Sequence, residues 1–241
     1  MKYFPKKLTM TWIRNSYKEG SLTPEELAGE IVRRAEKYRD YNIWIVAPDL
    51  KRMMGYIEKL PKDIESLPLW GIPFAVKDNI DVAGSPTTAA CPDYAYDPKE
   101  DAAVVKKLIE AGAFPVGKTN LDQFATGLVG TRSPYGEVKN ALDPELISGG
   151  SSSGSAVSVA LGMAAFSLGT DTAGSGRVPA ALNCLVGYKP SLGAWSTKGV
   201  VPACASLDCV TVFANSLEDA EKVNLAARGV DEAVSYTHLR A

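Results

Sequence analysis

The sequence contains one histidine in 241 residues, and this scarcity restricts the chemistry that the chain can carry out. His238 stands three residues from the end of the sequence, in a short terminal segment that we expect to fray. A Ser-His-Asp triad, a Cys-His dyad and a histidine-rich metal site all need an imidazole held inside the fold. Hydrolytic chemistry in this chain therefore needs a base other than histidine.

Cysteine is also scarce, and its spacing disfavours two further kinds of site. The four cysteines, at positions 91, 184, 204 and 209, form no Cys-x-x-Cys pair, and no histidine accompanies them at ligand spacing. A zinc site and a disulfide framework are both disfavoured by this spacing. We expect reduced thiols that are mostly buried, and we expect neither a metal nor a cofactor.

The sequence has no long apolar run and no strong excess of charge. Its longest apolar stretches, such as Ala156–Leu168, are too short and too rich in small residues to span a bilayer. The first residues lack the apolar core of a signal peptide. Apolar residues make up 46%, charged residues 22%, and the formal net charge is −2, which gives no electrostatic reason to expect nucleic acid or a membrane as a partner. We expect a cytoplasmic protein.

The pattern of apolar residues predicts alternating helices and strands. Residues 8–60 have a helical pattern, in which Thr23 suits an N-cap, Pro24 suits the first helical position, and a further helix covers Asp49–Leu60. Strand-like and helical segments then alternate: a strand at Leu69–Val76, a helix at Asp101–Ala111, a strand at Phe114–Gly117, a helix beginning at Asn120, and a helix of small residues at Ser155–Leu168. This alternation indicates an α/β fold with a mixed or parallel sheet.

No repeat and no linker divides the chain, so we expect one domain. Residues 1–65 are predicted to form a helical N-terminal layer, and residues 66–228 a catalytic α/β core. Leu217–Arg228 has the pattern of a helix that is beginning to cover a sheet. Residues 229–241 do not continue this pattern, so we expect a foreign or disordered tail behind the front part of a longer, truncated domain.

The first of three unusual segments is an apolar strand that ends in a lysine. Lys77 follows the run Gly71–Val76 and precedes Asp78 and Asn79. An ammonium group removed from water costs several kcal/mol unless it is paired or deprotonated. Burial lowers the pKa of a lysine, and a neutral lysine is a competent general base. Taken alone, Lys77 could equally reach solvent from the end of its strand.

The second segment is a Gly/Ser turn at residues 148–155, Ser-Gly-Gly-Ser-Ser-Ser-Gly-Ser, which opens the small-residue helix. A flexible linker has this composition, but linkers are not usually joined directly to an apolar helix. A phosphate-binding loop would use the same helix start, but the Gly-Lys-Ser/Thr ending of the Walker motif is absent. The third interpretation is a turn that presents a serine hydroxyl inward, which the flanking glycines permit.

The third segment, at residues 169–179, reads Gly-Thr-Asp-Thr-Ala-Gly-Ser-Gly-Arg-Val-Pro. Small residues before Ser175 let successive backbone N–H groups point into one space, an arrangement that suits an oxyanion hole. Taken singly, an ordinary Gly-rich turn between a strand and a helix is the simpler interpretation.

Together the three segments have the layout of a known family. A Gly/Ser turn follows the strand-end lysine by 74 residues, and a Gly-Ser turn follows that by 24. From its start to about residue 228, the chain resembles the amidase signature family. The resemblance implies a mixed central sheet covered by helices on both faces. It also implies a Ser–cisSer–Lys triad, with Ser175 as nucleophile, Ser151 as the bridging serine after a cis peptide, and Lys77 as base.

The resemblance assigns supporting roles to residues beside the triad. Its oxyanion hole corresponds to the backbone N–H groups of the stretch that leads to the nucleophile, namely Thr172, Ala173, Gly174 and Ser175 itself. Asp171 and Arg177 are expected to pair and hold the nucleophile loop, and Ser152 is counted among the supporting residues. One departure is Ser153, where most family members have glycine.

Within the family, three segments resemble the allophanate hydrolase branch: residues 119–136, 171–180 and 199–209. This resemblance implies hydrolysis of allophanate (urea-1-carboxylate) to ammonia and carbon dioxide in urea catabolism, with a urea carboxylase fused or separate and a homodimer at full length. Arg132 is the candidate for the substrate carboxylate, with a solvated loop arginine as the alternative. Gly127 is expected to contact substrate through its backbone.

Other functions compatible with the sequence are a glutamine-hydrolysing amidotransferase subunit for tRNA-dependent amidation, and an inactive fragment that acts only as a binding module. A fatty-acid-amide hydrolase is disfavoured, because no N-terminal membrane segment is present.

Overall fold

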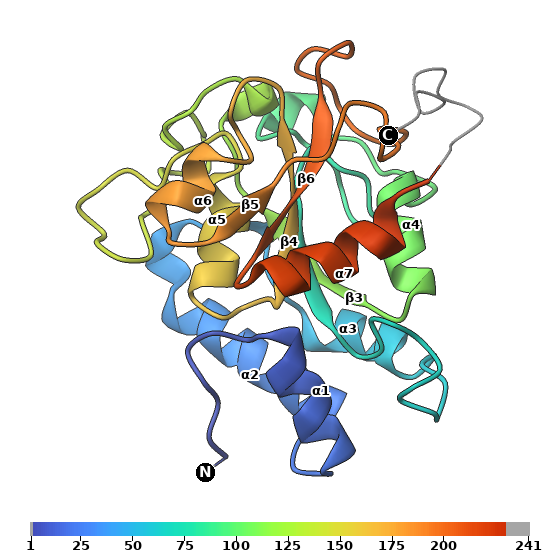
Figure 1. Cartoon of the computed structure of the whole chain (residues 1–241). Helices are drawn as coiled ribbons and strands as arrows, with labels where there is room; N and C mark the ends of the chain where they lie inside the picture. The colour runs from blue at the N-terminus through green and yellow to red at the C-terminus, as the bar shows by residue number, and fades with distance from the viewer. Residues whose placement is uncertain (1, 230–241) are drawn as a thin grey trace.

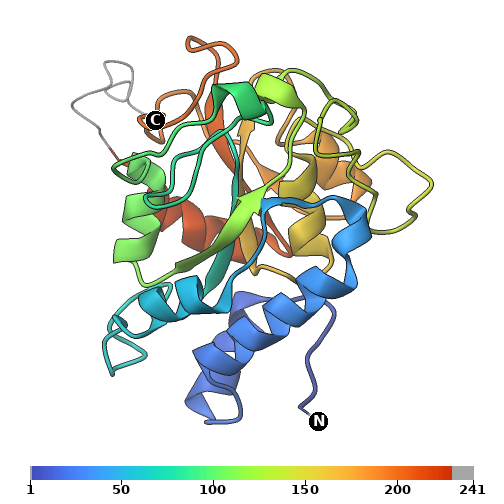
Figure 2. The same ribbon diagram turned by 180° about the vertical axis from the view of Figure 1, so that it is seen from behind.

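A computed structural model describes residues 2–229, which are organised around a mixed six-stranded sheet (Figures 1 and 2). The strands lie in the order β1-β3-β2-β4-β6-β5. The central strands β3, β2 and β4 run parallel, whereas the pairs β1–β3, β4–β6 and β6–β5 are antiparallel. Their bounds are β1 Trp44–Val46, β2 Pro73–Lys77, β3 Phe114–Thr119, β4 Phe166–Asp171, β5 Val186–Tyr188 and β6 Cys209–Ala214.

Helices cover both faces of this sheet, as expected from the sequence. Helix α5 packs on one face against β2 and β4, whereas α7 packs against β5 and β6 on the other face together with α4 (Figure 1). Helices α1 and α2 lie together at one end of the molecule (Figure 2). The α-helices are α1 Met10–Lys18, α2 Pro24–Lys37, α3 Leu50–Ile57, α4 Ala103–Glu110, α5 Ser153–Ala160, α6 Val178–Leu182 and α7 Leu217–Ala227. Short 3-10 turns are η1 Arg39–Tyr41, η2 Pro92–Tyr94 and η3 Gln123–Ala125.

The start of α2 confirms a detail of the sequence prediction. The Thr23 hydroxyl accepts from the Glu26 amide, and the Glu26 carboxylate accepts from the Thr23 amide, which makes a capping box. Pro24 occupies the first turn. The predicted helical layer is interrupted, however, because β1 lies inside it and pairs with the edge of β3.

Two of the predicted helices are wrong, one in its length and the other in its existence. The small-residue helix was expected over Ser155–Leu168, but α5 ends at Ala160 and the chain has become strand β4 by Phe166. Gly162 adopts φ +70°, a left-handed conformation that stops the helix, and its carbonyl accepts from the Arg34 guanidinium at 2.9 Å.

The helix predicted to begin at Asn120 does not form either. The Asn120 side-chain amide instead donates to the carbonyls of Asn42 (2.9 Å) and Gly136 (3.0 Å), so it ties together two loops. The only helical structure that follows closely within the described residues is the short turn η3.

Helix α5 is buried along its whole length, so none of its faces is exposed to solvent, and Gly154 shows how tightly it is packed. A Cβ at Gly154 would lie 2.8 Å from the Asn120 amide nitrogen and closer still to the Ile43 carbonyl, both of them backbone atoms that cannot move aside. Gly154→Ala is therefore expected to lower the free energy of unfolding by about 3 kcal/mol or more, measured by urea denaturation.

A matched control for this substitution is Gly29→Ala in α2. A Cβ at Gly29 meets no atom within 4 Å, and alanine is the better helix former, so this change should raise stability by about 0.5–1 kcal/mol. Equal effects at the two positions would contradict the packing described for α5.

Several expectations concern single residues or the ends of the chain. The four cysteines are free, but only Cys209 is buried and Cys184 is exposed, so the expectation of mostly buried thiols is wrong. Between residues 2 and 229, no helix is both long and apolar enough to cross a membrane. The predicted tail, apart from Gly229, and the single histidine lie outside the described residues.

Candidate active site

Lys77 ends strand β2 and points into the protein interior, where its side chain is 0% exposed. Its Nζ atom lies 2.7 Å from the Ser151 hydroxyl and 2.7 Å from the Thr170 hydroxyl. The alternative in which this lysine reaches solvent is therefore wrong. Strands β2 and β4 are parallel neighbours, so Lys77 and Thr170 emerge at the same edge of the sheet.

The charge state of Lys77 is finely balanced. Burial lowers its pKa from the usual 10.5 to about 7, and the negative charges of Asp122, Asp208 and Asp171 act in the opposite direction. Near neutral pH, a large fraction of Lys77 is therefore neutral and able to accept a proton.

Ser151 lies two residues before the start of α5 and is fully buried. The peptide bond between Gly150 and Ser151 is cis, as the resemblance implies. Ser152, the next residue, interacts with the backbone of Thr170: its hydroxyl donates to the Thr170 carbonyl at 3.1 Å and accepts from the Thr170 amide at 3.3 Å. Ser152 therefore holds the residue whose side chain contacts Lys77.

Ser175 lies in the turn between β4 and α6 and is only 4% exposed. Its hydroxyl donates to the Gly127 carbonyl at 3.3 Å. Within residues 2–229, no hydrogen bond joins Ser175 to Ser151. The fold thus brings Lys77 and Ser151 into direct contact, and it places the Ser175 hydroxyl on the carbonyl of Gly127.

Asp171 organises the turn that carries Ser175. Its buried carboxylate accepts from the amides of Gly174 (2.8 Å) and Gly176 (3.0 Å), and it forms a bidentate ion pair with Arg177 at 2.9 and 3.1 Å. Burial alone would raise the pKa of Asp171, but the Arg177 hydrogen bonds and the two amides outweigh it and lower the pKa. The expected pairing of Asp171 and Arg177 is confirmed.

This arrangement bears on the expected oxyanion hole. The Gly174 N–H already donates to Asp171, so it points to that carboxylate. The amides of Thr172, Ala173 and Ser175 donate to no other group in the described part of the chain. They are the N–H groups available to a developing negative charge. The Thr172 hydroxyl donates to Asp208, which accepts from the Cys204 amide as well.

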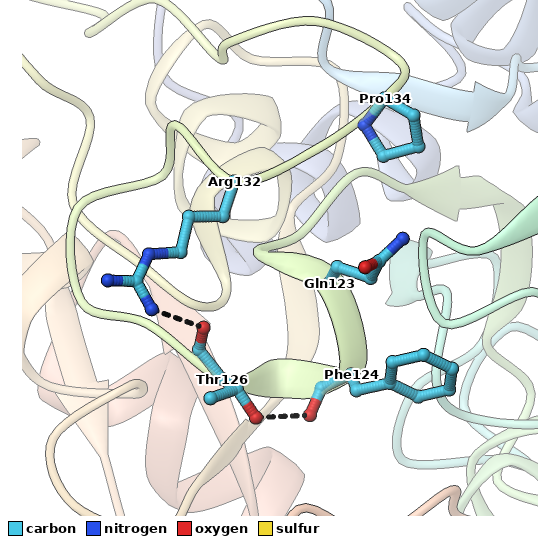
Figure 3. Close-up of a pocket in the computed structure, with 5 residues that line it drawn as sticks. All are labelled: Gln123, Phe124, Thr126, Arg132 and Pro134. Carbon is cyan, nitrogen blue, oxygen red and sulfur yellow. Dashed lines mark hydrogen bonds between the residues drawn. The ribbon is translucent and has the colours of Figure 1, made fainter.

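Arg132 lies on the loop after η3, and its guanidinium is exposed. It lines an open hollow of about 600 Å³ together with Gln123, Phe124, Thr126 and Pro134 (Figure 3). The Arg132 side chain extends towards the Thr126 carbonyl at 3.5 Å, a long contact. None of the hydrogen bonds within residues 2–229 links this guanidinium to Lys77, Ser151 or Ser175.

Sequence reasoning missed three polar residues that act on Lys77: Thr170 through a hydrogen bond, and Asp122 and Asp208 through their charge. All three are buried. Each lies inside a segment that was recognised, but nothing in the local sequence shows that its side chain acts on a lysine 45 to 131 residues away. Strand β4, which carries Thr170, was not predicted, because the small-residue helix was expected to continue to Leu168.

Comparison with known proteins supports the assignment reached from the sequence. The amidase family model matches residues 26–239. Urea amidolyase from Saccharomyces cerevisiae is 60% identical over 183 residues, which are 75% of this chain and 10% of that protein. A glutamyl-tRNA(Gln) amidotransferase subunit from Methanosarcina acetivorans is 40% identical over 215 residues, which are 89% of this chain and 44% of that protein.

Two solved structures show the same fold. Allophanate hydrolase from Kluyveromyces lactis has a TM-score of 0.83 and 48% identity, covering 93% of this chain and 37% of that chain. Peptide amidase from Stenotrophomonas maltophilia has a TM-score of 0.88 and 32% identity, covering 97% of this chain and 50% of that chain. This chain thus spans half or less of the length of each of these relatives. By sequence and by fold, the chain belongs to the amidase family.

Proposed function

We propose that this chain carries the catalytic residues of an amide hydrolase, with Ser175 as nucleophile, Ser151 as proton bridge and Lys77 as general base. The observation that supports this most directly is the buried contact of 2.7 Å between Lys77 Nζ and Ser151 Oγ. A lysine with a pKa of about 7 can take a proton from a hydroxyl that it touches, and Ser-Lys pairs are a known alternative to histidine triads.

The proposed reaction begins when the Ser175 hydroxyl rotates from the Gly127 carbonyl towards Ser151. Neutral Lys77 accepts the Ser151 proton while Ser151 accepts the Ser175 proton, and Ser175 Oγ forms a bond to the amide carbonyl carbon. The free amides of the turn receive the charge that develops on the carbonyl oxygen. The C–N bond then breaks, the proton returns through Ser151 to the departing nitrogen, and ammonia leaves. Water attacks the acyl-enzyme ester and restores Ser175.

The similar proteins favour allophanate as the proposed substrate of this chain. Urea amidolyase and allophanate hydrolase are among the similar proteins at 48–60% identity, and the exposed guanidinium of Arg132 could bind a small carboxylate. A urea carboxylase, fused to this chain or separate from it, would supply the substrate. We also propose that the full-length protein forms a homodimer. The four free thiols suit a reducing compartment such as the cytoplasm.

A glutamine-hydrolysing amidotransferase subunit is the second candidate, because one subunit of that kind is 40% identical over most of this chain. It would share the same serine and lysine chemistry and differ in substrate. The binding-module alternative is less well supported, since Lys77, Ser151 and Ser175 are all present and buried.

The test is a side-by-side assay of ammonia release from allophanate, glutamine and a simple aliphatic amide by the natural protein. We expect allophanate to have the highest kcat/KM. Preference for glutamine would favour the amidotransferase. A fluorophosphonate probe tests the chemistry without a substrate, because it labels only an activated serine beside a formed oxyanion hole. Failure to label Ser175 would contradict the nucleophile assignment.

A further inference from the structure

Asp122 is a buried carboxylate to which the proposed reaction assigns no step. It lies between β3 and η3 and is 0% exposed. Its two oxygens accept from the amides of Gly130 (3.1 Å) and Arg132 (2.9 Å). Its own amide donates to the Ser151 carbonyl at 3.0 Å. Asp122 therefore holds the loop after η3 through its carboxylate and the bridging Ser151 through its backbone amide.

The carboxylate is also wedged between two glycines that flank the reacting groups. A Cβ at Gly127 would lie 2.5 Å from Asp122 Oδ2, and a Cβ at Gly150 would lie closer still. Gly127 carries the carbonyl that accepts from Ser175, and Gly150 directly precedes Ser151. The Asp122 carboxylate therefore packs closely against the backbone at Gly127 and at Gly150.

Asp122, unlike Asp171, has no basic side chain beside it in an ion pair within residues 2–229. The ion pair of Asp171 is with Arg177. Three carboxylates favour the ammonium form of Lys77, and Asp122 has the largest effect, followed by Asp208 and Asp171. An unpaired charge in a buried region acts strongly on another buried charge.

We propose that Asp122 is a positioning residue for the hydrolysis proposed above, on which this inference rests: its buried carboxylate, held by the amides of Gly130 and Arg132, packs against the backbone of Gly127 and Gly150 and so fixes the Gly127 carbonyl and Ser151 in place. The negative charge of Asp122 also favours the ammonium form of Lys77. Without this carboxylate, Lys77 would become neutral at lower pH, and the backbone at Gly127 and Gly150, beside the two serines, would lose the side chain that it packs against. A residue with a purely structural role would change the rate of reaction but not the pH at which Lys77 titrates.

The decisive experiment is a pH titration of Lys77 by NMR in the protein labelled with 13C at lysine Cε. Lys77→Met identifies the signal. We expect the Asp122→Asn variant to titrate about one pH unit lower than the wild type, because an opposite charge is removed. Asp143→Asn is the matched control: Asp143 also accepts a backbone amide, that of Glu145 at 3.0 Å, but it is exposed on a distant loop. It should leave the midpoint unchanged.

An Asp122→Asn midpoint equal to that of the wild type would overturn the electrostatic part of the proposal. The positioning part is tested with Asp122→Glu, which keeps the charge but is too long for the space between the two glycines, and which also serves if the asparagine variant does not fold. We expect a midpoint near the wild-type value and fluorophosphonate labelling of Ser175 at least tenfold slower. Labelling at the wild-type rate would overturn the positioning role.

The two readouts separate this inference from the proposed function. The NMR titration of Lys77 does not involve Ser175. If the probe fails to label Ser175 in the wild-type protein, the nucleophile assignment is contradicted. The titration midpoints of Lys77 would still show whether Asp122 affects its protonation. A wild-type protein that labels, with both Asp122 variants indistinguishable from it, would leave the proposed function standing and remove Asp122 from it.

Discussion

Replacing Ser175 by alanine is expected to reduce ammonia release by at least about 10⁴-fold and to abolish fluorophosphonate labelling, with no loss of folding. Removal of a catalytic nucleophile has effects of this size in serine hydrolases. The fold should tolerate the change, because the Ser175 hydroxyl makes one long hydrogen bond of 3.3 Å to the Gly127 carbonyl. Steady-state kinetics and thermal unfolding of the same preparation measure both effects.

Ser153→Ala is the matched control for Ser175→Ala. Ser153 is buried in the same Gly/Ser turn as Ser151, but its hydroxyl reaches only the Asn120 carbonyl, at 3.5 Å. Because this contact is long and lies outside the Lys77–Ser151 pair, we expect the activity of Ser153→Ala to stay within a few-fold of the wild type. An active Ser175→Ala protein, or an inactive Ser153→Ala protein, would mean that the nucleophile has been assigned to the wrong serine.

Lys77→Met is expected to be as inactive as Ser175→Ala, since methionine has similar length and no basic atom. In the wild type, activity should rise with pH through about 7, as Lys77 becomes neutral. The rise belongs to Lys77 only if the residual activity of the methionine variant lacks it. A pH–rate profile of kcat/KM for both proteins measures this.

The same substitution should also change how stability depends on pH. In the wild type, the folded-state pKa of Lys77 is depressed to about 7, whereas the unfolded chain titrates near 10.5. Between these values the unfolded state binds more protons, so stability rises with pH across this window, and below about 7 the full cost of the buried ammonium is present. Lys77→Met should remove this rise and be more stable than the wild type at pH 6, measured by urea denaturation.

Lys118→Met provides the contrast for that measurement. Lys118 is equally buried, but it forms an ion pair with buried Asp78 at 3.1 Å. Its replacement would leave Asp78 buried without its cation, which costs about 3–5 kcal/mol. If Lys77→Met raises stability and Lys118→Met lowers it, then Lys118 contributes its charge to the fold, whereas Lys77 is retained for its basicity.

The sequence was sufficient where structure is decided locally. Thr23 and Glu26 cap α2 as their spacing predicts, and Lys77 ends a buried strand. It was insufficient where distant segments decide the outcome. The residues from Ser155 to Leu168 suit a long helix, and Gly162 within this span can be either helical or left-handed. It is left-handed here, where its carbonyl accepts from Arg34, and the helix stops.

The candidate site divides in the same way. Lys77, Ser151 and Ser175 stand in motifs with unusual local composition, so the sequence shows them. Thr170 and Asp122 contribute through contacts that exist only after β2, β3 and β4 have paired. Thr170 lies in the same segment as Ser175, and Asp122 lies within residues 119–136, but only the tertiary structure reveals that Thr170 contacts Lys77 and that the charge of Asp122 acts on it.

The pairing of β2 with β4 restricts how this protein can change in length during evolution. Phe74 lies opposite Phe166 and Val76 opposite Leu168, and the stacked rings of the two phenylalanines, with centroids 5.2 Å apart, hold the register. Adding or deleting one residue within β2 would move Lys77 to the opposite face of the sheet, away from Ser151. Insertions in the exposed loop at residues 142–147 would move neither side chain. In an alignment of natural variants, gaps should therefore gather in such loops and be absent from these two strands.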